Sequence, residues 1–455
     1  MEITLDLSAV PTENPIVLIW WFFKTIGWIY PVFLFCLALI LYYQLWIRNN
    51  YRATRKYMLL AVDVPKENEQ GPKAVENIFN QLAGAHQPLG FYEKWWHGEV
   101  PDSFSFEIVS LGGYIQFIIH FDAKYRDLIE AIIYAQYPDA EIVEIEDYTK
   151  DWDLRFPNEK YDLWGTELVQ TKSQYYPIRL YEEFEDTEGY KDSMAGFLEA
   201  LTRIGPGEQI WTQLVVTPAD NDWGDKSENL IKKLSGAKVE SKKNIFDYVF
   251  DVPNMIISEI FSSGAPATET HKKDEPYNLM MHLTQGEKDT ISAIEKKVGK
   301  IGFHTRIRIL YFAEKARFNK PVTKAIYGAY KQFNTLDWNG LKPLSKTLTA
   351  GLVWFKNYRL NIRKRKIFYR YKWRGHWLEP DNFIGPGNFG KIFNSEELAS
   401  MYHFPMLTVK TPLLKKTEAK KAEPPMSLPI NNGPSGIVQK DLSPKSGPPE
   451  NLPIG

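Results

Sequence analysis

The residue pattern with the clearest chemical meaning is a basic and aromatic run from Lys356 to Arg374. The run, KNYRLNIRKRKIFYRYKWR, holds nine basic residues and no acidic residue. Phosphate groups attract such a stripe, and the interleaved aromatic rings can stack on exposed bases or rest at a lipid interface. The basic side chains considered for contact with nucleic acid or anionic lipid are Arg363, Lys364, Arg365, Lys366, Arg370, Lys372 and Arg374.

The spacing within this run predicts a strand over residues 366–377. Arg370, Lys372 and Arg374 alternate with aromatic residues, so an extended chain would present one basic and one aromatic face. Three interpretations follow from that geometry. The strand is half-buried with its aromatic side chains in a core, or its basic face binds nucleic acid, or it binds anionic lipid or an acidic partner.

A second motif, GPGNFGKI at residues 385–392, satisfies the spacing G-x-x-x-x-G-K of a phosphate-binding loop. Such a loop needs backbone amides aimed at the phosphates, a following helix, and a Ser or Thr hydroxyl for magnesium. Pro386 removes one amide and Ile392 stands where the hydroxyl is needed. Asn394 and Glu397 have the spacing of a capping box, which starts the next helix too late. The motif therefore predicts a glycine-rich turn.

The remaining reactive residue types give no catalytic pattern. The eight histidines have no metal-ligand spacing, and the chain has no G-x-S-x-G elbow. Adjacent or alternating carboxylates, such as Glu182 with Glu183 and Glu144 with Glu146, fit solvated faces better than acid-base chemistry. The sequence therefore predicts no catalytic residue, no metal site, no cofactor and no small-molecule substrate, and we expect the protein not to be an enzyme.

An apolar run near the N-terminus predicts a membrane anchor. Residues 26–47 carry no formal charge, and a helix of this length reaches roughly 33 Å, enough for one span. The membrane segment is placed at residues 15–47, after a short extracytoplasmic N-terminus at residues 1–14. Residues chosen to mark the anchor are Ile26, Trp28, Pro31, Phe35, Leu39 and Trp46.

The charges beside the span predict its orientation. Arg48, Arg52, Arg55 and Lys56 follow the apolar run, whereas the residues before it include acidic residues and no basic residue up to position 14. The positive-inside rule then places the N-terminus outside the cell membrane and all later domains in the cytoplasm. The single cysteine, Cys36, lies inside the anchor, so no disulfide forms within one chain.

Alternating and helical spacings predict the folded part as α+β. Between residues 48 and 150 the order is β-α-β-β-α-β, with a two-residue hairpin at Gly112-Gly113, which is the order of a ferredoxin-like (split βαβ) sandwich. A second, diverged ferredoxin-like domain is predicted at residues 151–318, interrupted by an insertion at residues 222–281. The insertion is a covering subdomain, or a helix pair that binds a partner or touches the membrane.

Two further segments of different composition are predicted in the C-terminal part of the chain. Residues 319–404 form a helical and basic-aromatic subdomain, with helices expected from about 319 to 361. Residues 405–455 contain ten prolines and too few large apolar residues for a packed core. They are predicted to be a disordered tail. The net charge of the whole chain is −1, so no global electrostatic field indicates a nucleic-acid partner.

Several strings resemble a family of membrane-anchored bacterial proteins of uncharacterised function. They are VPKENEQGPKAVENIFNQL (64–82), the stretch from FSFEIVSLGG to EIEDYT (104–149), GEQIWTQLVVTPADNDW (207–223) and NSEELASMYHFP (394–405). Members of that family occur as N-terminal modules ahead of type IV secretion-type, DNA-translocating ATPase domains. A proline-rich stretch like AKKAEPPMSLP leads into the ATPase of the fused members, and here no nucleotide-binding core follows it.

The resemblance implies a non-catalytic, membrane-anchored component of a conjugation-like or pilus-like secretion machine. Any ATP hydrolysis would then belong to a partner, so we expect the chain to dock a separate hexameric P-loop ATPase or other secretion subunits to the bilayer. The alternative, from another functional class, is a membrane-tethered module that binds DNA through residues 356–374.

Overall fold

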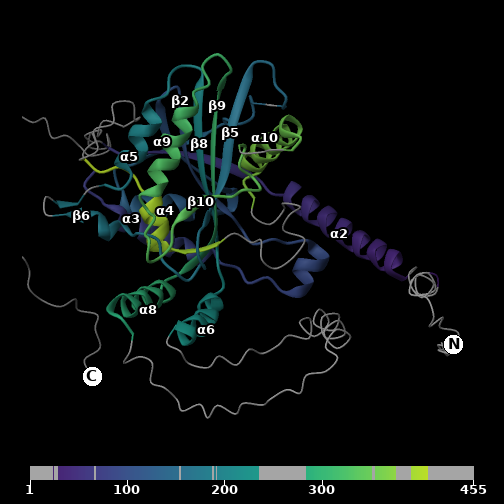
Figure 1. Cartoon of the computed structure of the whole chain (residues 1–455), viewed down its shortest axis with the longest axis horizontal. Helices are drawn as coiled ribbons and strands as arrows, with labels where there is room; N and C mark the ends of the chain where they lie inside the picture. Colours follow the sequence, from purple (N-terminus) through teal and green to yellow (C-terminus); the bar gives the residue numbers. More distant parts are fainter. Residues whose placement is uncertain are drawn as a thin grey trace, which may run out of the picture. The chain divides into compact units, whose positions relative to one another are not determined.

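The computed structural model describes residues 24, 29–65, 68–152, 155–186, 189–190, 192–234, 283–350, 354–375 and 391–407. These residues form a mixed α+β fold with an apolar N-terminal helix and a large antiparallel sheet (Figure 1). Its strands are β1 (Tyr57–Asp63), β2 (Phe104–Leu111), β3 (Tyr114–Asp122), β4 (Glu141–Ile145), β5 (Tyr161–Gln170), β8 (Glu208–Pro218), β9 (Gly302–Glu314), β10 (Leu341–Pro343) and β11 (Lys391–Asn394). A separate two-stranded ribbon pairs β6 (Glu185–Asp186) with β7 (Gly189–Tyr190).

The main sheet runs in the order β10-β5-β9-β8-β2-β3-β1-β4, and β11 pairs with β9 beside this path. Every one of these pairings is antiparallel. The pairing of β2 with β8, from Phe104 opposite Val216 to Leu111 opposite Gln209, joins the N-terminal four strands to the rest. The residues predicted to form two domains therefore share one continuous sheet.

One face of the sheet is covered by helices packed into a single large core. These helices are α3 (Pro72–Leu82), α4 (Arg126–Gln136), α5 (Ala195–Thr202), α9 (Lys320–Lys331) and α11 (Ser395–Met401). Strand residues alternate between the two faces, as the pleat of a strand requires. Ile309 and Tyr311 of β9 face this core, whereas Leu310 and Phe312 face the opposite side.

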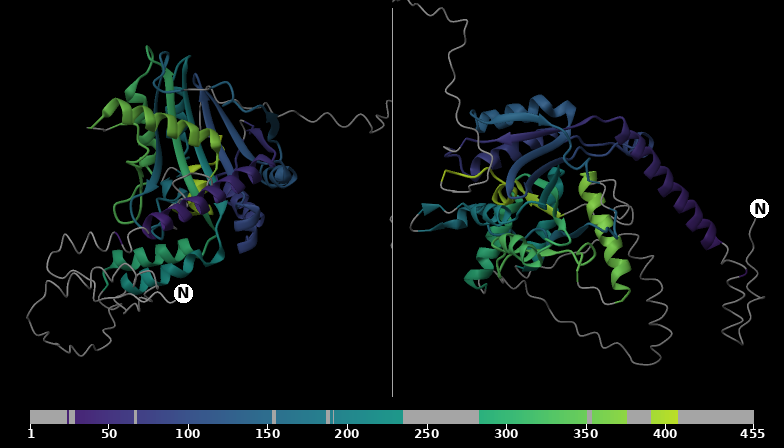
Figure 2. Two further views of the ribbon diagram at one scale, coloured as in Figure 1. Left: turned by 90° about the vertical axis from the view of Figure 1, so that its right-hand side faces the viewer. Right: turned by 90° about the horizontal axis from the view of Figure 1, so that it is seen from above.

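The opposite face is covered by α10 (Lys356–Trp373) (Figures 1 and 2). Ile367, Phe368 and Tyr371 pack onto strand residues that include Trp211, itself fully buried. The prediction of a strand at residues 366–373 is wrong. The buried residues at 364, 367, 368 and 371 recur with the period of a helix, so the helix buries one face, which includes Lys364, while most of its basic residues lie outside that face.

The predicted elements of residues 48–150 are all present. The apolar residues Val75, Ile78, Phe79 and Leu82 form the buried face of α3. The hairpin between β2 and β3 is confirmed, since Gly112 and Gly113 adopt φ values of 59° and 98°. Both values lie in the left-handed region that a tight two-residue turn requires and that glycine adopts without strain.

The second half differs more from expectation. The strand spacing of residues 167–181 predicts one or two strands there, whereas β5 begins at Tyr161 and residues 171–184 form turns that end in the 3₁₀ segment Tyr181–Phe184. The apolar spacing of residues 287–300 predicts a helix, and α8 (Gln285–Val298) is present there, beginning with a capping box on Thr284. The helices expected from 319 to 361 are interrupted by β10. This strand pairs with β5 and is the last strand at that edge of the sheet.

Of the insertion predicted at residues 222–281, the structure describes residues 222–234. After β8 the chain forms the 3₁₀ turn η6 (Asn221–Gly224) and α6 (Asp225–Leu234), and it returns through α8. The apolar string at residues 244–263, for which a covering role and a partner- or membrane-binding role are the alternatives, lies outside the described residues.

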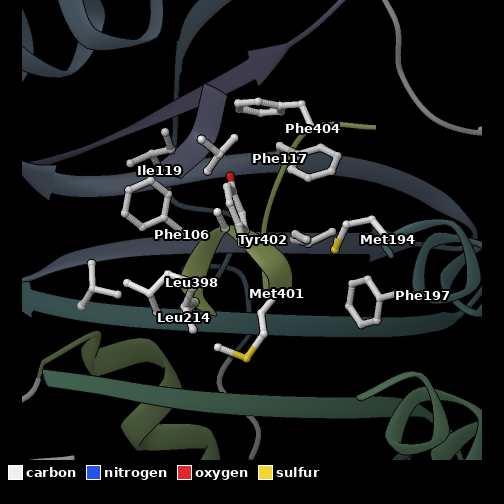
Figure 3. Close-up of a cluster of buried hydrophobic side chains, with 14 of the residues drawn as sticks. Phe106, Phe117, Ile119, Met194, Phe197, Leu214, Leu398, Met401, Tyr402 and Phe404 are labelled. Atoms are coloured by element: carbon white, nitrogen blue, oxygen red, sulfur yellow. The ribbon is translucent and has the colours of Figure 1, made fainter. Parts of the chain in front are cut away.

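The segment that follows the glycine-rich motif packs into the main core. Asn394 caps α11 through a capping box with Glu397, as predicted. Leu398, Met401, Tyr402 and Phe404 lie among Phe106, Phe117 and neighbouring residues of the sheet (Figure 3). Residues 406 and 407, which fall within the predicted tail, contact the folded part, because the Met406 amide donates to Asp192 and the Leu407 amide to Asn68. Residues 408–455 lie outside the described residues.

The N-terminal helix α2 (Ile29–Ala53) is long and apolar enough to cross a membrane. Of the residues chosen to mark the anchor, Pro31, Phe35, Leu39 and Trp46 lie on α2 with exposed side chains, and Ile26 and Trp28 lie outside the described residues. The helix continues beyond the apolar run to Ala53. Arg48 and Arg52 of the positive flank are therefore part of the same helix.

Candidate nucleic-acid interface

A cleft of about 510 Å³ lies between α10 and the edge of the sheet. Its floor consists of residues 167–170 of β5 and residues 305–307 of β9. One wall is α10, and the other combines the segment after β10 with β11. This volume falls in the range of about 300–1,000 Å³ that is typical of ligand sites.

The lining of the cleft is strongly basic. Among the residues that the structure describes, the lining contains one carboxylate, Glu167, and six basic side chains, namely Arg306, Lys346, Arg363, Lys366, Arg370 and Lys391. The lysines at 346, 366 and 391 are exposed. Such an excess of cations in a concave surface attracts and holds polyanions.

Glu167 organises the arginines at the base of the cleft. Its carboxylate accepts from Arg308 Nε at 3.0 Å, and Arg306 and Arg370 approach it at 3.8 and 3.9 Å. Burial alone would raise the pKa of Glu167, but the charges of Arg308, Arg306 and Arg370 outweigh it and lower this pKa. Within the described part of the chain, one buried carboxylate thus lies among three guanidinium groups at the base of the cleft.

Arg363 contributes a further positive charge to the cleft from α10. Its guanidinium donates to the carbonyl oxygen of Leu348 at 2.7 Å. Desolvation and then repulsion by Arg359 lower the pKa of Arg363. A phosphate bound nearby would reverse both effects, because an anion favours the charged form of a guanidinium.

An aromatic groove adjoins the cleft along α10. Arg155, Arg365, Lys366, Phe368, Tyr369, Lys372 and Trp373 line it, and Lys366 also lines the cleft. Tyr369 is 59% exposed and stacks on Trp373, with ring centroids 5.4 Å apart. Trp373 is half-buried, and the exposed ring of Tyr369 beside basic side chains is a combination that can bind single-stranded nucleic acid by stacking and by phosphate contact.

The structure distributes the sequence-predicted contact residues among three environments. Arg363, Lys366 and Arg370 line the cleft, and Arg365 and Lys372 line the aromatic groove with Lys366. Lys364 and Arg374 are buried, 7% and 4% exposed. Lys364 pairs with Asp162, and Arg374 pairs with Glu107 and Asp147. These two residues hold α10 to the sheet and do not face a ligand.

Sequence reasoning missed Arg306, Lys346 and Lys391, which complete the cleft. They come from β9, the segment after β10, and β11, which are far apart in the sequence. Each of these three residues is a single basic residue in or near a strand, so the sequence around it gives little indication of a binding site. Only the pairing of β11 with β9, with Lys391 opposite Thr305, brings Lys391 to this place.

A buried polar network fixes the C-terminal end of α10. Arg374 Nε donates to Glu107 at 2.8 Å, and its two terminal nitrogens donate to Asp147 at 2.8 and 3.0 Å. Tyr148 donates to Glu107 at 2.7 Å and lies 2.9 Å from the Tyr371 hydroxyl. The orientation of the basic face of α10 thus depends on ion pairs beneath it.

Acid should weaken this network through Asp147. Burial raises the pKa of Asp147, but the hydrogen bonds and charge of Arg374 and the Thr149 amide lower it to about 2. A carboxyl whose pKa is depressed from about 3.9 stabilises the fold by about 2 kcal/mol above that pH, and this contribution is lost as the pH falls toward 2. Asp147→Asn should therefore lower the free energy of unfolding at neutral pH. The difference in this free energy between the variant and wild type should shrink to near zero as the pH falls from 4 to 2.

The measurement for Asp147 is urea unfolding of the full chain in detergent micelles, followed by near-ultraviolet circular dichroism at several pH values. Exposed Asp139 is the matched control, and Asp139→Asn should change stability little at any of them. A difference between Asp147→Asn and wild type that persists unchanged at pH 2 would contradict this role for the carboxylate.

The basic residues after the apolar run also make protein contacts. Arg55 pairs with Asp102 at 2.9 Å and with Asp122 at 2.6 Å. The Arg52 guanidinium lies 3.9 Å from the centre of the Trp373 ring and donates to the Trp373 carbonyl. Arg48 is half-buried and Lys56 is exposed. These contacts join the end of α2 to β3, to the loop before β2 and to the end of α10.

The glycine-rich motif does not have the geometry of a phosphate-binding loop at its end. Lys391 and Ile392 begin a strand, whereas the lysine of such a loop lies at the start of a helix. Within the described residues, no group of three or more His, Cys, Asp or Glu side chains is placed to hold a metal ion.

Comparison with known proteins identifies the family. The family described as a domain of unknown function (DUF8128) matches residues 52–341, from the last turn of α2 to the start of β10. No curated protein matches the chain. The match contains the β5 and β9 floor of the cleft, whereas α10, Lys346 and Lys391 follow it. The match covers more than half of the sequence, and the chain therefore belongs to the DUF8128 family.

Proposed function

We propose that the protein is a membrane-anchored module that binds single-stranded nucleic acid through the cleft and the aromatic groove. The observation that carries the proposal is that the exposed Lys346, Lys366 and Lys391 line one cleft, next to the exposed ring of Tyr369, which stacks on half-buried Trp373. The cations bind backbone phosphates, and the rings stack on bases. No reaction is assigned to these residues, so the module is proposed to be non-catalytic.

The test is binding of a fluorescent single-stranded DNA by the full chain in nanodiscs of zwitterionic lipid. If the cleft holds phosphates, the logarithm of the binding constant should fall linearly with the logarithm of the salt concentration. Longer oligonucleotides should compete, and a mononucleotide should compete poorly. Salt-insensitive binding, or a preference for vesicles of anionic lipid over DNA, would contradict the proposal.

A second candidate function is a component of a type IV secretion-like, conjugation-like or pilus-like machine that docks a separate hexameric P-loop ATPase. Its support is that the anchor and the start of the proline-rich stretch join the same folded unit. Arg55 ties the end of α2 to Asp102 and Asp122, and the residues just before position 408 bond to Asn68 and Asp192. The point at which the chain enters the proline-rich stretch thus belongs to the same folded unit as the end of α2.

This second candidate is tested by affinity capture of the tagged full chain and of a variant ending at Leu407, with identification of the partners. Recovery of a P-loop ATPase by the full chain, and its loss from the shortened variant, would support docking through the tail. Failure of both forms to recover any ATPase would contradict the candidate.

The membrane placement and the finer fold class belong to the same proposal. We infer that α2 spans the inner membrane with its N-terminus outside, on the basis of the positive flank. We also infer two ferredoxin-like units, because strands β4-β1-β3-β2 and strands β10-β5-β9-β8 repeat one spatial order. Cysteine accessibility on either side of the membrane in whole cells tests the orientation.

A further inference from the structure

A cluster of exposed aromatic residues lies beside the end of α2 in the short helical segment Phe91–His97, which includes the π-helical turn η3 (Glu93–His97) and is here named the aromatic loop. The exposed fractions are 76% for Phe91, 59% for Tyr92, 39% for Trp95 and 58% for Trp96. Phe91 stacks on Trp95 at 5.6 Å, and Tyr92 meets Trp96 edge-on at 6.5 Å. A contiguous patch of large aromatic side chains on a surface indicates an interaction site.

Three contacts fix the aromatic loop to α2. The Trp96 ring meets the ring of Tyr43 edge-on at 6.5 Å, and Gln44 Nε2 donates to the Trp95 carbonyl at 3.2 Å. Gly98 adopts a φ of 69°, and a Cβ at this position would lie 2.7 Å from the carbonyl carbon of Ile47. Only glycine permits this approach, so the loop and the helix form one unit.

The positions of these contacts determine how deep the aromatic loop lies. Tyr43 precedes Ile47, the last residue of the apolar run, by four residues, which is about 6 Å along the helix. Gln44 is 3% exposed, and an amide inside a membrane span needs an internal hydrogen-bond partner. The Trp95 carbonyl supplies that partner. The aromatic loop is therefore level with the final turn of the apolar run.

We propose that the aromatic loop is a second membrane contact, which inserts Tyr92, Trp95 and Trp96 into the headgroup region of the leaflet where α2 ends. This inference rests on the proposed anchoring by α2. Trp and Tyr favour the membrane interface because their rings are amphipathic. Tyr42, Tyr43 and Trp46 on α2 are exposed at the same level and extend the patch. Because α2 and the aromatic loop both contact the bilayer and are joined to each other, the sheet is held close to the membrane in a fixed orientation.

The single cysteine makes a direct test straightforward. In a Cys36→Ala background, an environment-sensitive fluorophore is attached to Trp96→Cys and, separately, to Tyr92→Cys. The full chain is placed in nanodiscs whose lipids carry a spin-label quencher either near the headgroup or at the chain end. Two controls use the same label, Phe35→Cys on α2 near the middle of the apolar run 26–47 and Leu336→Cys at a position 96% exposed and remote from α2 in sequence.

Labels at positions 92 and 96 should show blue-shifted emission and lose at least half of their intensity with the headgroup quencher, and less with the chain-end quencher. The label at 336 should respond to neither, and the label at 35 should respond most to the chain-end quencher. Quenching at 35 without quenching at 92 and 96 would overturn the aromatic-loop contact and leave the anchor standing. Absence of quenching at 35 would overturn the anchor itself.

Discussion

Replacement of Lys346, Lys366 and Lys391 together by glutamate is expected to weaken binding of single-stranded DNA about 100-fold or more at low salt, because each lysine near a polyanion contributes about 1 kcal/mol. The three side chains are exposed, line the same cleft and come from three different elements. Removing three phosphate contacts should also reduce the salt slope by about 2 for a single strand. The readout is fluorescence anisotropy across a series of salt concentrations.

A matched triple variant separates a local site from a general loss of positive charge. Lys150, Lys233 and Lys288 are exposed and lie outside the cleft, so their replacement by glutamate changes the net charge equally. We expect this control to bind DNA within a few-fold of wild type. Equal losses in the two triple variants would mean that binding follows net charge, and the cleft would lose its assigned role.

Arg374→Met is expected to lower the free energy of unfolding by about 3–5 kcal/mol, because it leaves a buried carboxylate without its cationic partner. Glu107 is fully buried, and Arg374 contacts it at 2.8 Å. Burial disfavours the charge of Arg374, but Glu107, Tyr148 and Asp147 hold its pKa well above the usual value. The loss should appear in urea unfolding of the full chain in detergent micelles.

Arg365→Met is the control for this change, because Arg365 lies on the same helix and is exposed. Its effect on stability should stay within about 0.5 kcal/mol. Adding Glu107→Gln to Arg374→Met should recover part of the loss, since the unpaired charge is then removed. A single variant as stable as wild type would show that the Arg374 ion pairs are not what holds α10 to the sheet.

Local patterns predicted most elements of the first half of the sheet. The apolar spacing of α3 and α4, the alternation of β2 and β3, and the Gly112-Gly113 turn are short-range features that the sequence displays directly. The same is true of the capping box at Asn394 and Glu397. Such features are decided by neighbouring residues, so they can be read without knowledge of the fold.

The secondary structure of the basic and aromatic run at residues 356–374 could not be predicted from its local sequence. Alternation of Arg370, Lys372 and Arg374 with aromatic residues resembles a strand, yet the run forms α10. The deciding interaction is the burial of Ile367, Phe368 and Tyr371 on Trp211, which stabilises the helix by roughly 1.5–3 kcal/mol for each large apolar side chain. Trp211 lies on another strand, so the sequence of the run could not reveal this surface.

The sequence by itself determined an apolar segment able to cross a membrane, an α+β composition, and a charge-rich stretch near the C-terminus, because each depends on composition or short spacing. Only the tertiary structure decided which basic residues line the cleft and which are buried in the core. Lys366 and Arg374 belong to the same run, but one lines the cleft and the other is buried against Glu107. That difference arises from the direction in which each side chain leaves a helix packed on a sheet, and from strand pairings that bring Lys391 beside Thr305.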